Sequence, residues 1–387
     1  NNNPDETGMF EENGRVKAIR LRGELSEGFI LPAVMLENYV LSVTNVELTC
    51  VEGTEFDIVE HEGKTFWINK KYIPKNTRIP GTPGSSQGKG KQPKGLDKII
   101  ENQFRFHYDT TLIKKCPHVI KPNDLISITE KVHGTSGISA YVVCKHPRNF
   151  ANKVISWISE KLFGLEIEGT TQYYHDYDYL YSSRSVIKNQ YYNKQAGPGF
   201  YGCDVWKFAD DVVRPWLQKG MTAYYEIVGF LPNGGYIQKG YDYGCIPPKE
   251  GDVYQHGVHF KVLVYRITMT NVDGNVHEFS AREVQQWCNF VNLTPVHQYY
   301  YGYASDLYPE LDPAEHWNEN FLQKLANESL FYMEQDSPTC NNKVPHEGVV
   351  IKVENMKSEA FKLKCFKFLD KEGKALDKGE SNIEDVN

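Results

Sequence analysis

The stretch from Ile126 to Gly137, Ile-Ser-Ile-Thr-Glu-Lys-Val-His-Gly-Thr-Ser-Gly, decides the fold of this chain. It begins with alternating polar and apolar residues, passes through Lys131 and then Gly134, and enters a second alternating segment that ends near Val143. Alternation with period two is typical of strands, and glycine permits a tight turn or a close approach of backbone. The pattern predicts two strands joined by a turn that presents Lys131.

Two later stretches complete the pattern, Glu347-Gly348-Val349-Val350-Ile351-Lys352 and Phe361-Lys362-Leu363-Lys364. Residues two apart on a strand point to the same face, so Lys362 and Lys364 should reach one site while Leu363 packs inward. Each fragment alone has a structural explanation, since a lysine turn, a hairpin glycine and a lysine-bearing edge strand are all common. Their order along the chain predicts a nucleophilic lysine that attacks a nucleotide.

The chemistry explains why these residue types occur together. A free lysine has a pKa near 10.4, so only about one in a thousand is neutral at physiological pH, and attack on phosphorus needs the neutral amine. Burial and neighbouring cations lower such a pKa, and Lys362 with Lys364 would supply part of that field. The carboxylates Glu226 and Glu347 are expected to hold magnesium, directly or through its waters, with a ribose hydroxyl as the alternative partner of Glu226.

Further candidates accompany this set. Arg184, in Ser-Ser-Arg, suits a phosphate or sugar clamp. Phe260 and Tyr265 are both able to stack on a base; they should face opposite sides of one strand, and the sequence leaves the choice between them open. His133 suits either a surface turn or a supporting role beside the site.

Length and composition limit the function classes. The 387 residues suffice for two domains, and the net charge of −7 argues against a protein that coats nucleic acid nonspecifically, although a local basic groove is compatible with it. The 25 tyrosines suit base-stacking surfaces or aromatic-rich β-structure. Eight cysteines without a CxxC pair disfavour zinc and disulfides and favour a cytoplasmic or otherwise intracellular protein. A membrane span is not expected, because no apolar run of about 18 residues occurs.

The chain is expected to contain two domains and a tail. Short strand-like segments predict a small β-barrel of the OB type in residues 1–95, at 15–21, 28–32, 41–46 and 56–59. This domain ends in a Gly/Pro/Ser/Lys-rich linker from residue 79 onward. Residues 96–370 are expected to form an α+β nucleotidyltransferase-type domain of antiparallel sheets and helices. Residues 371–387 are expected to form a charged, flexible tail.

Within the second domain, helices are expected at 149–163, 204–219, 280–291 and 314–330, and central strands at 224–229 and 260–265. Asp204 is the expected N-cap of one helix, and Ser280 with Glu283 forms the signature of a capping box in another.

The ordered motifs resemble the covalent nucleotidyltransferase superfamily of ligases and capping enzymes, and specifically an ATP-dependent RNA ligase. The matching elements are Lys131 with Gly134, Ser183-Arg184, residues 225–229, residues 260–265, residues 347–352 and Lys362-Leu363-Lys364. Residues 14–28 are similar to the class that places an OB module before the transferase domain. The histidine at position 133 follows RNA ligases that seal nicked duplexes, whereas DNA ligases usually carry an aspartate there.

The resemblance implies three steps: Lys131 takes up AMP from ATP, the adenylate passes to an RNA 5′-phosphate, and a 3′-hydroxyl attacks and expels AMP. It implies ATP and Mg²⁺ or Mn²⁺ as cofactors, a nicked RNA duplex as partner and a monomeric protein. Metal binding is expected at Glu226 and Glu347. The nucleotide-binding residues that it implies are Glu130, Val132, Gly134, Arg184, Glu226, Phe260, Tyr265, Glu347, Lys352, Lys362 and Lys364.

The chain also departs from the family pattern. Ser136 stands where many relatives have arginine or asparagine, and His133 stands where some have an acid that helps to hold metal waters. Three alternatives remain: a DNA ligase, an mRNA-capping guanylyltransferase and a noncatalytic OB-fold RNA-binding protein. Capping enzymes usually carry their OB module after the transferase domain, yet only a short charged tail follows Lys364.

Overall fold

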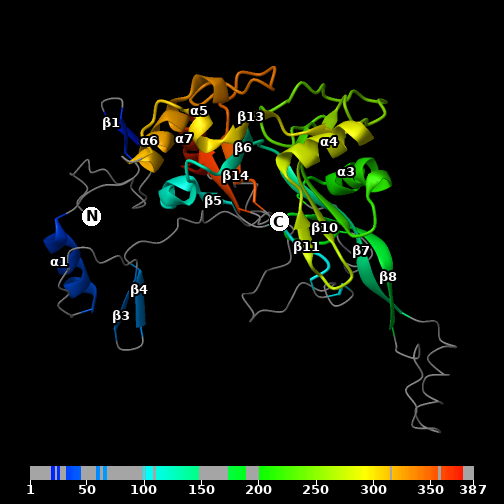
Figure 1. Cartoon of the computed structure of the whole chain (residues 1–387), viewed down its shortest axis with the longest axis horizontal. Helices are drawn as coiled ribbons and strands as arrows, with labels where there is room; N and C mark the ends of the chain where they lie inside the picture. Colours follow the sequence, from blue (N-terminus) through cyan, green and yellow to red (C-terminus); the bar gives the residue numbers. More distant parts are fainter. Residues whose placement is uncertain are drawn as a thin grey trace, which may run out of the picture. The chain divides into compact units, whose positions relative to one another are not determined.

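The computed structural model describes residues 19–21, 24–26, 32–44, 58–61, 64–67, 99–100, 102–107, 110–147, 173–188, 200–313, 316–355 and 359–377. The chain divides into two compact units (Figure 1). One contains Asn1–Thr82 and Leu369–Asn382, and the other contains Pro83–Phe368 and Ile383–Asn387. Of the described helices, none has the length and apolar character needed to cross a membrane.

Within residues 1–82, the described part of the first unit forms two antiparallel strand pairs and a helix. Strand β1 (Ile19–Leu21) pairs with β2 (Glu24–Ser26), and β3 (Ile58–His61) pairs with β4 (Lys64–Trp67). None of these described strands belongs to a closed sheet, so the expected OB barrel is not shown. The strand expected at 41–46 is wrong over 41–44, which belong to helix α1 (Ala33–Thr44), because apolar residues recur there at helical spacing and Val40 is buried.

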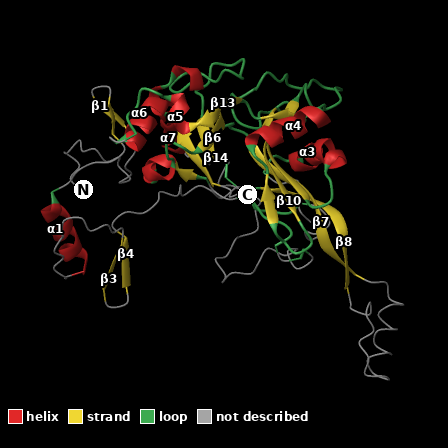
Figure 2. Cartoon of the chain, viewed as in Figure 1, coloured by secondary structure: helices red, strands yellow, loops and turns green. Residues whose placement is uncertain are grey.

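The second unit holds two sheets. The first has the strand order β13-β6-β14-β15-β5, antiparallel except for the parallel β15–β5 pair. Its inner face packs Ile128 and Ile351 against Trp317 and Phe321 of helix α6. Figure 2 shows α5 and α6 beside this sheet. The elements are β5 (Thr111–Leu112), β6 (Leu125–Glu130), β13 (Gln298–Tyr303), β14 (Gly348–Val353), β15 (Glu359–Lys364), α5 (Ala304–Leu307) and α6 (Trp317–Asn327).

The second sheet has the order β11-β10-β9-β7-β8, with β12 beside β10. Helices α3 and α4 cover one face, where Trp206 and Cys288 join a core with Ile227 and Val262 (Figure 1). The elements are β7 (Thr135–Pro147), β8 (Tyr173–Ser183), β9 (Met221–Gly229), β10 (Phe260–Thr270), β11 (Val276–Glu278), β12 (Thr294–Pro295), α3 (Val205–Val213) and α4 (Ala281–Val291). The mixed fold with antiparallel sheets confirms the expected class, and β9 and β10 contain the expected central strands.

Most expected helices of this unit are confirmed. Asp204 caps α3 by accepting from the Lys207 backbone N–H at 3.1 Å, and Ser280 with Glu283 forms the capping box of α4. Helix α6 lies within the helix expected at 314–330. The helix expected at 149–163 lies outside the described residues. Short 3₁₀ helices complete the architecture: η2 (Ile113–Lys115), η3 (Pro117–Val119), η4 (Arg214–Trp216) and η5 (Ser329–Phe331).

The flexible tail expected from residue 371 is wrong for residues 371–377, which belong to helix α7 (Phe366–Asp377). Burial of Phe368 fixes the start of this helix in the core, so the charged residues that follow can continue it.

Candidate active site

Lys131 lies on the turn that connects the two sheets of the second unit, between β6 and β7. Its backbone N–H donates to the Gly348 carbonyl at 2.9 Å, which ties the turn to the start of β14. A Cβ at Gly134 would lie 2.5 Å from the Ile227 carbonyl oxygen and 2.7 Å from Glu226 Cγ. The other end of the turn therefore packs directly on β9, and only glycine fits there.

A buried carboxylate faces this lysine. Glu347 Oε1 lies 2.5 Å from Lys131 Nζ and 3.5 Å from Lys364 Nζ, and the Glu347 side chain is 1% exposed. Gly348 pairs with Lys364 in the β14–β15 ladder, which explains why the side chains of Glu347 and Lys364 reach each other. Gly348 has φ +138°, and a Cβ there would overlap the Leu363 carbonyl. The structure thus brings together the lysine turn, the carboxylate and one of the two late lysines.

His133 is held by aromatic neighbours. Its ring packs edge-on against Tyr241 and Phe368, with centroids 4.9 Å away in both cases, and its backbone N–H donates to the Tyr243 hydroxyl at 2.7 Å. Its Nδ1 lies 3.7 Å from Glu347 Oε2. The His133 imidazole therefore packs beside both the turn and the Glu347 carboxylate.

Lys131 also lines a pocket of about 1230 Å³, open mouth included, between the two sheets. Nine residues expected from the sequence line it: Glu130, Lys131, Val132, Gly134, Arg184, Glu226, Tyr265, Lys352 and Lys362.

The structure separates the two aromatic candidates on β10. Phe260 is buried under α3 and α4 and stacks on Tyr254 at 4.7 Å, outside the lining of the pocket. Tyr265 lines the pocket, and its hydroxyl lies 3.2 Å from Ser136 Oγ and 3.0 Å from His107 Nδ1. A β-bulge between Val264 and Arg266 places two successive side chains on the pocket face.

Cations dominate the pocket wall. Burial and the nearby cations Arg184, Arg266, Lys131 and Lys362 lower the pKa of His107 to about 3. Lys352 adds a further positive charge.

Carboxylates on the same wall offset only part of this charge. Glu130, Glu226 and Glu278 line the pocket. Burial raises the pKa of Glu130 to about 7, so this carboxyl is partly protonated at neutral pH. The lining thus carries five cations and three carboxylates, while Glu347 and Glu354 pair with Lys131 and Lys352 from outside it.

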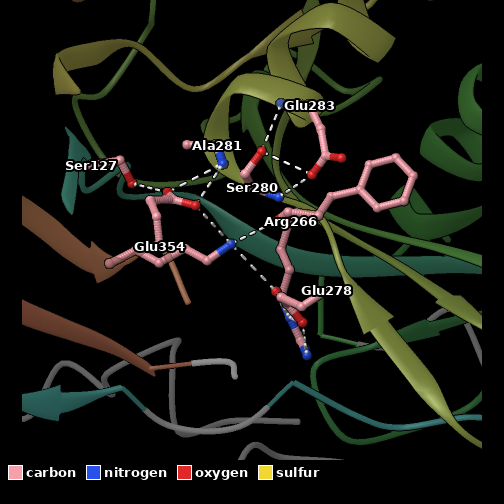
Figure 3. A network of polar contacts seen from close by, with 9 residues as sticks. Ser127, Arg266, Glu278, Ser280, Ala281, Glu283 and Glu354 are labelled. Atoms are coloured by element: carbon pink, nitrogen blue, oxygen red, sulfur yellow. Dashed lines mark hydrogen bonds and ion pairs between the residues drawn. The ribbon is translucent and has the colours of Figure 1, made fainter. Parts of the chain in front are cut away.

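A buried polar network forms one wall of the pocket and joins the two sheets (Figure 3). Arg266 on β10 pairs with both oxygens of Glu278 on β11, with N···O distances of 2.8, 3.1 and 2.8 Å. Lys352 on β14 lies 3.8 Å from the same carboxylate and donates to the Phe279 carbonyl at 2.5 Å. Glu278 therefore holds cations from both sheets.

Glu354 continues this network. Its carboxylate accepts from Ser127 Oγ at 2.6 Å and from the Ala281 backbone N–H at 3.2 Å, and it lies 3.9 Å from Lys352 Nζ (Figure 3). Because Ala281 is the first residue of α4, the carboxylate also stabilises the positive end of that helix.

The part of the chain that the structure describes contains no group of three or more His, Cys, Asp or Glu side chains able to hold a metal ion. Magnesium usually binds through one or two carboxylates, several waters and substrate phosphates, so it does not need such a group. Glu226 on the pocket wall and Glu347 beside Lys131 supply oxygen ligands of the required kind. Glu226 presents its carboxylate to the pocket, whereas Glu347 is buried beside Lys131 and does not belong to the pocket lining.

Sequence reasoning missed His107, Arg266 and Glu278. Opposite charges on a hairpin are a weak signal for the Arg266–Glu278 pair, because cross-strand neighbours attract. No sequence pattern around His107 indicates that this residue lines the pocket.

Comparisons with known proteins give distant structural similarity. No protein-family model and no curated protein matches the sequence. A lysine-to-alanine mutant of a Naegleria gruberi RNA ligase, solved with ATP and Mn, is 15% identical, with 94% of this chain and 79% of that chain covered and a TM-score of 0.45. A second, apo Naegleria gruberi RNA ligase mutant is 15% identical, with 92% and 75% covered and a TM-score of 0.43. An archaeal ATP-dependent RNA ligase is 12% identical, with 70% and 50% covered and a TM-score of 0.35. The chain is thus similar in structure to these RNA ligases.

Proposed function

We propose that this chain is an ATP-dependent RNA ligase that joins 3′-hydroxyl and 5′-phosphate ends through a lysyl-AMP intermediate. The observation that carries the proposal is the position of Lys131. Its amine lies on a glycine-bounded turn between two sheets, 2.5 Å from a buried carboxylate and on the wall of a cation-rich pocket. A lysine with a purely structural role would need neither the buried carboxylate nor the cation-rich pocket.

In the first step, the Lys131 amine attacks the α-phosphorus of ATP, a P–N bond forms, and pyrophosphate leaves with the electrons of the broken P–O bond. The ammonium that faces Glu347 first gives up its proton to water in the open pocket, because only the neutral amine attacks phosphorus. Lys364 lies 3.5 Å from the same carboxylate oxygen, so Glu347 retains a cationic partner when Nζ turns toward the pocket. Because Lys364 stays beside Glu347, the Lys131 amine can move away without leaving the buried carboxylate unpaired.

The pocket residues orient the nucleotide. Tyr265 supplies the aromatic surface for the base, and Glu226 accepts a ribose hydroxyl or holds the waters of a metal. Arg184, Lys352 and Lys362 offset the negative charge of the phosphates. A divalent cation bound by Glu226 and Glu347 would add positive charge at the phosphates and help pyrophosphate to leave.

The RNA steps follow from the resemblance of the motifs. The adenylate passes to an RNA 5′-phosphate, and a 3′-hydroxyl then displaces AMP and closes the strand. The histidine at position 133 supports nicked RNA duplexes as substrates, since nick-sealing RNA ligases share it.

The test has two parts. The protein is incubated with magnesium and labelled ATP or GTP, and the label that survives a denaturing gel is measured. We expect label from ATP alone, its loss in Lys131→Ala and its retention in Lys249→Ala, which changes an exposed lysine. Label from GTP would identify a capping enzyme, and no label from either nucleotide would contradict the proposal.

The second part measures sealing of matched nicks that carry ribose or deoxyribose on each side. Sealing that requires ribose at the 3′-hydroxyl strand would support an RNA ligase. Equal sealing of all-DNA nicks would favour the DNA ligase alternative.

A further inference from the structure

The connection between β9 and β10 contains a segment, residues 238–243, that contacts the turn between β6 and β7. We call this segment the support loop. The Tyr243 hydroxyl accepts from the His133 backbone N–H at 2.7 Å, and Gln238 Nε2 donates to the Gly134 carbonyl at 2.7 Å. Both side chains are buried, and neither belongs to the lining of the pocket. The support loop therefore holds the turn by its backbone without reaching the pocket.

The support loop also holds the segment that leads to Glu347. The Asp242 carboxylate accepts from the backbone N–H groups of residues 341–342, at 2.8 Å each. The Tyr241 hydroxyl donates to the Pro345 carbonyl at 2.8 Å, two residues before Glu347. One loop thus contacts both the turn that carries the nucleophilic lysine and the segment that carries its carboxylate partner.

The backbone of the support loop is strained at Tyr243. This residue has φ +49°, in the left-handed region that bulky side chains rarely adopt. Lys261 Nζ donates to the Tyr243 carbonyl at 2.7 Å. The Asp242 carboxylate, which is 4% exposed, accepts from the Gly244 backbone N–H at 2.8 Å. These contacts hold the residue from both sides, and strain that is imposed in this way concentrates at functional sites.

We propose that the support loop positions the nucleophile: Tyr243 and Gln238 fix the backbone of the turn, and Asp242 fixes the loop. This inference rests on the proposed function and adds positioning residues to it. Attack needs the amine about 3–3.5 Å from the phosphorus, and a misplacement of roughly 1 Å slows such a step on the order of 100-fold. The Lys131 backbone N–H is bonded to β14, and the support loop supplies the second fixed point that gives the side chain a defined direction.

The test separates the step in which Lys131 is the nucleophile from a step in which it is not. Single-turnover self-adenylylation is measured over a range of ATP concentrations. Sealing of a nick whose 5′ end already carries AMP is measured without ATP, because an RNA 3′-hydroxyl is then the nucleophile. Tyr243→Phe removes the hydroxyl and keeps the ring. The control is Tyr254→Phe, which removes a hydroxyl that donates to the Phe230 carbonyl at 2.6 Å and does not contact the turn.

We expect Tyr243→Phe to lower the maximal rate of self-adenylylation at least about tenfold. The ATP concentration at half-maximal rate should stay within about twofold of the wild type, because the lost hydroxyl contacts the turn and not the pocket. Sealing of the adenylylated nick should keep its wild-type rate. The control should match the wild type in both reactions.

Asp242→Asn provides a second variant that leaves Tyr243 in place. The amide keeps one oxygen acceptor but turns an NH₂ group toward a backbone N–H to which the carboxylate is now bonded, so the support loop loosens. Self-adenylylation should again slow at an unchanged half-maximal ATP concentration, while sealing of the adenylylated nick is retained.

Wild-type rates of self-adenylylation in both variants would overturn the inference. Equal losses in both reactions would also overturn it, because they would show that the support loop serves folding alone. A higher half-maximal ATP concentration at an unchanged maximal rate would instead place the effect on nucleotide binding and refute positioning. If the wild type forms no lysyl adduct, the proposed function fails and the positioning role fails with it. A wild type that reacts beside variants that react equally fast removes the positioning role alone.

Discussion

Glu130 is a buried carboxyl directly before the nucleophile turn, and its titration should dominate the stability of this region near neutral pH. Its side chain accepts from Thr339 Oγ1 at 2.8 Å and lies 4.0 Å from His346 Nε2. Burial raises its pKa from 4.5 to about 7. Because the folded protein holds this proton more tightly than the unfolded chain, the contribution to stability is complete below pH 4.5 and is lost as the pH rises to about 7.

The magnitude follows from the size of this change. An increase from 4.5 to about 7 corresponds to an upper value of about 3 kcal/mol, at about 1.4 kcal/mol per pH unit. Glu130→Gln removes the titration but keeps the side-chain length and an oxygen that accepts from Thr339. The stability of the variant relative to the wild type should therefore increase from pH 5 to pH 8, by up to that amount. Burial lowers the pKa of His346 from 6.5 to about 4, so its titration opposes that of Glu130 at the acidic end of this range.

The assay is urea unfolding of both proteins at pH 5, 6, 7 and 8, followed by circular dichroism and tryptophan fluorescence. Glu250→Gln, at an exposed glutamate, serves as the control and should show no trend with pH. A stability difference for Glu130→Gln that stays constant across this range would refute the reasoning, as would one that falls with increasing pH.

Three further predictions concern the site and the domains. Glu347→Ala, Lys362→Ala and Lys364→Ala should each reduce nick sealing at least tenfold, which is about 1.4 kcal/mol of barrier; near-native sealing by all three would remove the site assignment. Glu278→Ala leaves its arginine partner buried without this carboxylate, so urea unfolding should show a loss of about 3 kcal/mol, against a smaller loss in Glu278→Gln. Deletion of residues 1–95 should leave self-adenylylation largely intact and weaken RNA binding in gel-shift assays. Loss of adenylylation in a folded truncation would contradict that division of roles.

Local patterns predicted much of the second unit. The turn at Lys131 between two strands, the N-cap at Asp204 and the capping box at Ser280 each depend on neighbours within a few residues, so the sequence contains the whole signal. Lys131 and Glu347 are distant in sequence; motif order predicted that both belong to one site, with Glu347 at a metal, but it did not predict that the two side chains touch.

Features that depend on tertiary structure were not predictable. The bulge at Tyr265 inserts one residue, and so it places Tyr265 and Arg266 on one face where strict alternation would separate them. The network around Glu278 joins strands of two sheets, and no periodic pattern in the sequence indicates such a contact. In the first unit, residues 41–44 alternate like a strand, but burial of Val40 favours a helix instead.

The most direct test of the central claim is intact-mass spectrometry of the wild-type protein after exposure to ATP and magnesium, followed by peptide mapping. We expect one added AMP per chain, bound to Lys131 through an acid-labile P–N bond and released by pyrophosphate. The absence of any AMP adduct on the folded protein, or an adduct that persists in Lys131→Ala, would contradict the account.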